Sequence, residues 1–127
     1  MKNFIVRILA RKHRKDKRHE VHEGVLVVVD PNSENKDKII DISLGGLAFC
    51  YDNERKRLNE KFEVDIYVDN ELYIKKLNVQ LVSDAEIGEV PFESANVRRL
   101  SGQFMWLTPV QKSDLNSLFR KYRIGKA

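Results

Sequence analysis

The sequence predicts a mainly β domain, an antiparallel barrel that is capped by one C-terminal helix. Short apolar runs rich in β-branched residues recur along the 127-residue chain, and turn-forming residues separate them. Residues 62–68 alternate apolar and polar side chains with the period of a half-buried antiparallel strand. From residue 108 onward, the spacing of the apolar residues changes to that of an amphipathic helix. Several short strands followed by one helix therefore indicate a barrel with a helical cap.

The first half of the chain carries three predicted strands. Residues 25–29 are four valines and one leucine, a composition typical of a strand, and a loop rich in turn formers follows them. The next apolar run is interrupted by Gly45 and Gly46, which divide it into two strands. We therefore expect strands at 25–29, 38–43 and 47–52.

Three further strands are predicted after a polar connection. The clean alternation of 62–68 is repeated, less regularly, by 72–82, and the last predicted strand is 103–107. Residues 83–102 are mostly polar and contain Gly88 and Pro91. We expect an irregular loop or an extended hairpin there, and we treat 86–102 as an insertion.

The C-terminal helix has a clear start signal. Thr108 is placed as the N-cap, Pro109 occupies the first helical position, and Gln111 lies three residues after the cap. The predicted helix covers about residues 109–123, and basic residues at its end complement the helix dipole. Its apolar stripe consists of Val110, Leu115, Leu118, Phe119 and Tyr122.

The chain length and cysteine content limit the class of protein. The length corresponds to about one domain, which we place at residues 11–127. Cys50 is the only cysteine, so an intramolecular disulfide is excluded, and this agrees with a cytoplasmic location. No apolar run approaches the roughly 20 residues that span a bilayer. Residues 1–10 are compatible with a short amphipathic helix, because four apolar side chains share one helical face: Phe4, Ile5, Ile8 and Leu9.

Positive charge is concentrated at the two ends of the chain. The net charge is +4, but residues 1–20 carry +6, residues 120–127 carry +4, and the body between them carries −6. A nucleic-acid-binding domain usually spreads basic residues over a folded face. We therefore do not expect nucleic acid as the partner, and the pattern favours a local anion site or a basic arm.

Enzymatic signatures are absent from the sequence. No glycine-rich phosphate loop of the P-loop or dinucleotide type occurs. His13, His19 and His22 are interpreted as surface histidines, since a metal site needs further ligands on rigid elements. Cys50 has no activating neighbour, and Trp106 is expected to pack in the core. The prediction is a protein that is not an enzyme and that uses no metal or cofactor.

Two short motifs, taken together, indicate a binding site. The first is Arg14-x-x-x-Arg18, within a stretch that places six basic residues in eight positions. The second is Asp41-x-Ser43-x-x-Gly46, and 23 positions separate Arg18 from Asp41. That gap holds one strand, a loop and most of a second strand. Because an antiparallel second strand returns to the start of the first, we expect Asp41 and Ser43 to lie near the arginine segment.

The side chains of these motifs suit an anionic guanine nucleotide. Guanidinium groups bind phosphates and the O6/N7 edge of guanine in bidentate fashion. A carboxylate such as Asp41 accepts hydrogen bonds from the guanine N1–H and amino group, and Ser43 adds a hydroxyl at the i+2 position. Gly46 permits a sharp turn or the close approach of backbone. The set implies binding and no catalytic step.

These two motifs, in this order, resemble those of the PilZ family over roughly residues 11–122. The resemblance implies a six-stranded antiparallel β-barrel with a C-terminal helix, and a receptor for cyclic di-GMP, a bacterial second messenger. It further implies that Arg14 and Arg18 clamp phosphate and guanine, that Asp41 and Ser43 contact the guanine edge, and that Gly46 permits close packing. Additional contacts are expected from His13, Lys15 and Gly45. His13 stands where many members carry an arginine, which leaves the ligand stoichiometry open.

The resemblance also implies how such a receptor works. Binding would order the N-terminal arginine segment and present a changed surface to a protein partner that the sequence does not name, in signalling of the kind that regulates motility or biofilm formation. The protein would act as a monomer or a homodimer. Two alternatives stay open: a PilZ-like adaptor that binds no nucleotide, and a small nucleic-acid-binding barrel.

Overall fold

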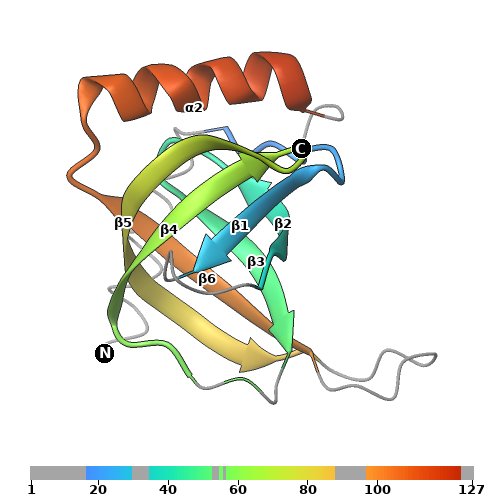
Figure 1. Cartoon of the computed structure of the whole chain (residues 1–127). Helices are drawn as coiled ribbons and strands as arrows, with labels where there is room; N and C mark the ends of the chain where they lie inside the picture. The colour runs from blue at the N-terminus through green and yellow to red at the C-terminus, as the bar shows by residue number, and fades with distance from the viewer. Residues whose placement is uncertain (1–16, 30–34, 53–54, 56, 88–96, 124–127) are drawn as a thin grey trace.

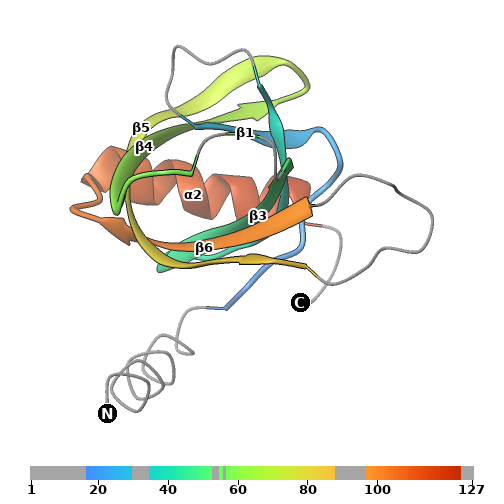
Figure 2. The ribbon, with the colours of Figure 1, turned by 90° about the horizontal axis from the view of Figure 1, so that it is seen from below.

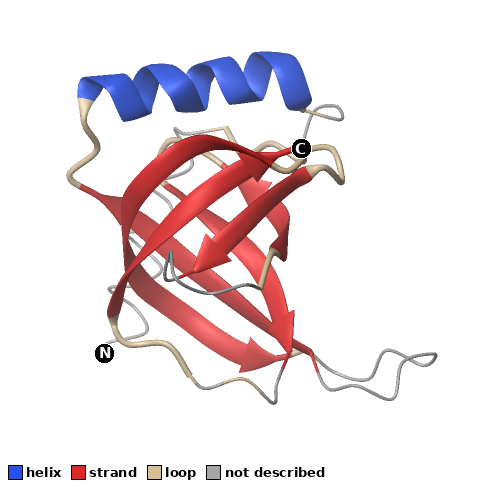
Figure 3. Ribbon diagram, in the orientation of Figure 1, coloured by secondary structure: helices blue, strands red, loops and turns tan. Residues whose placement is uncertain are grey.

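The computed structural model describes residues 17–29, 35–52, 55, 57–87 and 97–123. Six antiparallel strands close into a barrel in the order β1-β2-β3-β6-β5-β4, and helix α2 follows them (Figures 1 and 3). The predicted capped six-stranded barrel is therefore confirmed. The elements are β1 (Val25–Val29), β2 (Asp37–Ile42), β3 (Gly46–Asp52), β4 (Lys61–Val68), β5 (Glu71–Glu86), β6 (Val97–Met105) and α2 (Pro109–Tyr122).

The barrel closes around a core of alternating inward side chains. In β4, Val64, Ile66 and Val68 are buried, as the alternation of the sequence predicts. β4 also closes the barrel by pairing with β1 over the whole length of β1, from Val25 to Val29. The largest fully buried side chains are Phe49, Ile42, Ile66, Ile74, Leu77, Leu100, Leu115 and Leu118.

Helix α2 lies across one open end of the barrel, as the view along the barrel shows (Figure 2). Its start is the predicted capping box: the Gln111 amide donates to the Thr108 hydroxyl and the Thr108 amide donates to the Gln111 side chain, both at 3.0 Å. Gln111 Nε2 also donates to the carbonyls of Lys75 and Lys76 at 3.1 Å, which ties the start of the helix to β5. Leu115 is buried at the mouth of the barrel.

Three polar side chains form a hydrogen-bonded cluster at the other end of the barrel. The Tyr51 hydroxyl donates to Asp84 at 2.5 Å, and Arg98 Nε donates to the same carboxylate at 2.8 Å. Tyr51 is near the end of β3, Asp84 near the end of β5 and Arg98 near the start of β6. These strand ends lie at the side of the barrel away from α2 (Figure 1). Burial, together with the charge of Asp84, raises the pKa of Tyr51, so its hydroxyl stays protonated and able to donate at neutral pH.

The hairpin of β5 and β6 is longer than the sequence predicts. Residues 83–86 continue β5, and β6 begins at Val97 rather than 103, so both ends of the expected irregular region 83–102 are regular sheet. The pairing continues through a register shift between Leu81 and Ser83 and places Glu86 opposite Arg98. The register shift breaks the apolar alternation from which the strand bounds were predicted. The opposite charges of Glu86 and Arg98 support the pairing beyond the shift.

No helix in the described part of the chain has both the length and the apolar character needed to cross a membrane. The segment 1–10, for which an amphipathic helix was expected, lies outside the described residues, as does most of the 86–102 stretch.

Candidate functional site

The two sequence motifs meet at the end of β2. Arg18 Nη1 lies 3.3 Å from Asp41 Oδ1, across a sequence separation of 23 residues. The backbone enforces this contact, because the His19 amide donates to the Ile42 carbonyl at 2.9 Å and the Ile42 amide donates to the His19 carbonyl at 3.0 Å. The predicted proximity of Arg18 and Asp41 is thus present in the structure.

β2 directs the Asp41 carboxylate out of the barrel. Ile39 and Ile42 are buried in the core, and a register shift between Ile39 and Asp41 accommodates the spacing. The Asp41 side chain is 17% exposed and the Arg18 side chain is 61% exposed. Such an exposed ion pair contributes only about 0–1 kcal/mol to stability, so an incoming ligand can replace it at little cost.

Arg99 is a third member of the cluster that the sequence analysis missed. Its Nη2 lies 3.9 Å from Asp41 Oδ2, so the carboxylate has a guanidinium on each side. Arg99 reaches this place from β6, where it pairs with Cys50. Arg99 was missed because residues 97–102 were expected in an irregular loop or an extended hairpin, without a strand pairing that would align Arg99 with β3.

Ser43 holds the turn between β2 and β3. Its hydroxyl accepts hydrogen bonds from the amides of Gly45 at 3.0 Å and Gly46 at 3.3 Å, and its own amide donates to the Gly46 carbonyl at 2.8 Å. The side chain is buried. These contacts make Ser43 an organiser of the turn that presents Asp41, a role available to a short hydroxyl side chain.

Gly46 is required by close packing between strands. A Cβ at this position would lie 2.0 Å from the backbone oxygen of Gly102 on β6. Backbone atoms in a paired sheet cannot move aside cheaply, so a side chain here would force β3 and β6 apart. The expectation of close packing at Gly46 therefore has a direct physical basis.

The remaining predicted residues fall into two groups. Arg14, His13 and Lys15 lie outside the described residues, while Gly45 is in the turn, where its carbonyl accepts from the Phe104 amide at 2.9 Å. Cys50 is half-buried, and burial raises the pKa of its thiol, which disfavours the thiolate that a nucleophile needs. Within the described residues, no group of three His, Cys, Asp or Glu side chains is placed to hold a metal ion.

The prediction that His19 is a surface histidine is wrong. His19 is 9% exposed, and its ring stacks on Phe119 of α2 with centroids 4.4 Å apart. Burial, followed by the charges of Arg123 and Lys17, lowers the pKa of His19 below its ordinary value. The basic character of the surrounding sequence suggested exposure, and only the fold places this ring under the helix.

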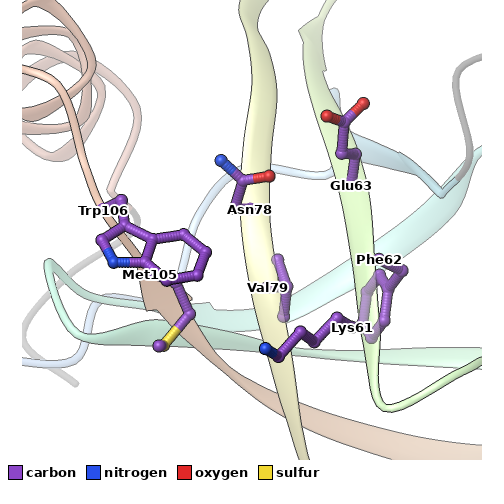
Figure 4. Close-up of a pocket in the computed structure, with 7 residues that line it drawn as sticks. All are labelled: Lys61, Phe62, Glu63, Asn78, Val79, Met105 and Trp106. Carbon is purple, nitrogen blue, oxygen red and sulfur yellow. The ribbon is translucent and has the colours of Figure 1, made fainter.

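A groove on the outer face of β4, β5 and β6 contains Trp106, a second residue whose environment differs from the prediction (Figure 4). Trp106, expected in the core, is 71% exposed, because β6 ends at Met105 and a φ of 51° turns the indole outward. Lys61 lies 5.8 Å from the indole centroid, a cation–π contact. The groove has a volume of about 180 Å³ and is lined by Lys61, Phe62, Glu63, Asn78, Val79, Met105 and Trp106.

Solved structures of PilZ domains resemble this barrel. The PilZ domain of YcgR from Escherichia coli, solved with cyclic di-GMP, matches with a TM-score of 0.60 at 23% sequence identity, covering 85% of this chain and 92% of that one. The chain has the PilZ-domain fold. The Borreliella burgdorferi PlzA protein, solved in complex with cyclic di-GMP, matches with a TM-score of 0.56 at 13% identity. That match covers 99% of this chain and 61% of PlzA.

Comparison of the sequence alone with protein-family models and with curated proteins finds no match. The PilZ fold is thus visible in the order and closure of the strands rather than in overall sequence similarity. Within that fold, the contact between Arg18 and Asp41 connects the two motifs that suggested the resemblance.

Proposed function

We propose that this protein is a non-catalytic receptor for cyclic di-GMP that acts in the bacterial cytoplasm. Ligand binding orders the N-terminal arginine segment and passes the signal to a protein partner, with the receptor acting as a monomer or a homodimer. The observation that carries the proposal is the contact between Arg18 and Asp41, at 3.3 Å. It joins the arginine motif to the Asp41–Gly46 motif on a barrel whose structural neighbours were solved with this nucleotide.

The chemistry of the cluster supports an anionic guanine nucleotide. Arg18 is largely exposed and Arg99 lies on the other side of Asp41, so two guanidinium groups can exchange a carboxylate partner for phosphate or guanine acceptors. Asp41, released in part from these arginines, accepts from the N1–H and amino group of guanine. Arg14 is proposed to complete the clamp, together with contacts from His13, Lys15 and Gly45.

Isothermal titration calorimetry tests the proposal. Wild-type protein should bind cyclic di-GMP at micromolar or lower concentration and should show no comparable heat with GTP or cyclic GMP. Arg14→Ala and Arg18→Ala should each abolish measurable binding. Arg57→Ala is the matched control: it removes an exposed arginine that lies in the connection following the far end of β3 and that donates to the Arg55 carbonyl at 3.1 Å. A folded wild-type sample that gives no heat with cyclic di-GMP would refute the proposal.

A second candidate function is a nucleotide-independent adaptor. The observation that favours it is the groove beside Trp106, where a large aromatic side chain is exposed at a strained backbone position. Exposed tryptophans are enriched among the residues that dominate protein–protein interfaces. The titration separates the two functions, since an adaptor of this kind gives no heat with the nucleotide while remaining folded.

A further inference from the structure

The segment 18–22, here called the strap, connects the candidate nucleotide site to helix α2. At one side, His19 exchanges two backbone hydrogen bonds with Ile42, at 2.9 and 3.0 Å, directly beside Asp41. At the other side, Val21 forms a β-bridge with Arg123, and the His22 amide donates to the Tyr122 carbonyl at 2.9 Å. The strap is therefore joined by backbone hydrogen bonds to both the end of β2 and the end of α2.

The side chain of His19 strengthens the link to the helix. Its ring stacks on Phe119 with an angle of 27° between the planes and 4.4 Å between the centroids. Both side chains are buried. The next residue toward the N-terminus is Arg18, whose guanidinium contacts Asp41. A change in the position of the His19 backbone therefore also moves the Arg18 Cα relative to the Asp41 carboxylate.

We propose that His19 and Phe119 are positioning residues for the ligand site, and that their stack couples the site to the C-terminal turn of α2. The stack holds the strap against Ile42 and thereby keeps Arg18 within reach of Asp41. This inference rests on the proposed binding of cyclic di-GMP for its ligand-dependent part only. Because coupling between two sites is reciprocal, a ligand that fixes Arg18 also stabilises the last turn of the helix.

Hydrogen exchange without ligand tests the positioning step. The amides of His19 and Ile42 are the reporters, because they form the paired hydrogen bonds of the strap. In Phe119→Leu, which removes the aromatic stack but keeps an apolar side chain, their exchange should accelerate roughly twofold to tenfold, the range that one aromatic pair supports. Tyr73→Leu is the matched control, since it removes the edge-to-face pair of Tyr73 and Tyr122 between β5 and the same helix.

Unchanged exchange at His19 and Ile42 in Phe119→Leu would overturn the positioning role. Equal acceleration in Tyr73→Leu would overturn it as well, because general loosening of α2 would then explain the effect. His19→Phe provides the conservative replacement: it retains a ring on Phe119 and should keep wild-type exchange at Ile42, whereas His19→Ala should not.

Calorimetry and ligand-dependent exchange test the coupling. We expect His19→Ala and Phe119→Leu to weaken cyclic di-GMP binding by roughly fivefold or more, within the usual range of coupling between sites, and His19→Phe and Tyr73→Leu to bind like wild type. Ligand should slow amide exchange at residues 119–123 in wild type and in His19→Phe. Wild-type affinity in His19→Ala would overturn the coupling. A wild type that fails to bind refutes the proposed function instead, and the ligand-free measurements still decide the positioning role.

Discussion

The Arg18 guanidinium lies 3.3 Å from the Asp41 carboxylate, although one complete strand separates the two residues in the sequence. Arg18 approaches from the strap, while Asp41 projects from the end of β2 with Arg99 on its other side, 3.9 Å away. The cluster thus combines two exposed guanidinium groups with one less exposed carboxylate. In the proposed function, an anionic guanine nucleotide uses all three groups.

Removal of this contact should affect binding much more than stability. Arg18→Ala and Asp41→Asn should each change the free energy of unfolding by less than about 1 kcal/mol, because the Arg18 side chain is mostly exposed. Arg18→Ala should abolish measurable cyclic di-GMP binding, and Asp41→Asn should weaken it at least tenfold. Urea denaturation and calorimetry on the same samples measure the two effects. Loss of stability in proportion to loss of affinity would contradict a direct binding role.

Arg99 should contribute to affinity although it lies outside both motifs. Arg99→Ala should weaken cyclic di-GMP binding by roughly tenfold, the loss of one charge-assisted contact. Arg99→Lys should restore only part of the affinity, because an ammonium group cannot reproduce the bidentate fork. Calorimetry on the two variants beside Arg57→Ala measures the effect. Affinity in Arg99→Ala equal to that of the control would remove Arg99 from the site.

Two glycines provide a matched test of strand packing. Gly46→Ala should reduce the free energy of unfolding by about 2–3 kcal/mol, because the new Cβ would collide with the Gly102 backbone. Gly24→Ala should change it by less than about 1 kcal/mol, since its Cβ would meet the end of the Asp69 side chain, which can rotate away. Equal losses of stability in the two variants, measured by denaturation, would show that packing against the Gly102 backbone does not require glycine at position 46.

The polar cluster at the far end of the barrel should support stability and leave the ligand site unaffected. Asp84→Ala removes the shared acceptor of Tyr51 and Arg98 and should cost about 3 kcal/mol, as for other mostly buried ion pairs. Tyr51→Phe removes one hydrogen bond and should cost about 1 kcal/mol. Thermal and urea denaturation give these values. Calorimetry at a temperature where both variants are folded should show wild-type affinity for the nucleotide.

Stability should fall as the pH drops through the titration range of His19. Its pKa is lowered in the folded state from 6.5, by burial and by the positive charges of Arg123 and Lys17. The unfolded chain therefore takes up a proton first as the pH falls below about 6.5, which favours unfolding. His19→Phe should show a shallower loss of stability over this range than wild type in urea denaturation. A slope in His19→Phe equal to that of wild type would contradict this assignment.

Local patterns in the sequence determined the elements and the main contact of the site. The alternation of residues 62–68 specified a half-buried strand, and the Thr108 capping box specified the start of α2. The 23 positions between Arg18 and Asp41 predicted that Asp41 lies near the arginine segment, because they hold one strand, a loop and most of a returning strand, and the structure brings the two side chains into contact. These features depend on neighbouring residues and on short connections, so a single sequence contains the information needed to predict them.

Only the tertiary structure decided which distant side chains share an environment. Arg99 reaches Asp41 because β6 begins earlier than its polar sequence suggests and lies beside β3. His19 is buried because α2, about a hundred positions further along the chain, places Phe119 over it. Trp106 is exposed because the chain turns outward where β6 ends. In each case the environment depends on barrel closure and on the position of the helix, which involve residues far apart in the chain and leave no periodic trace in the sequence.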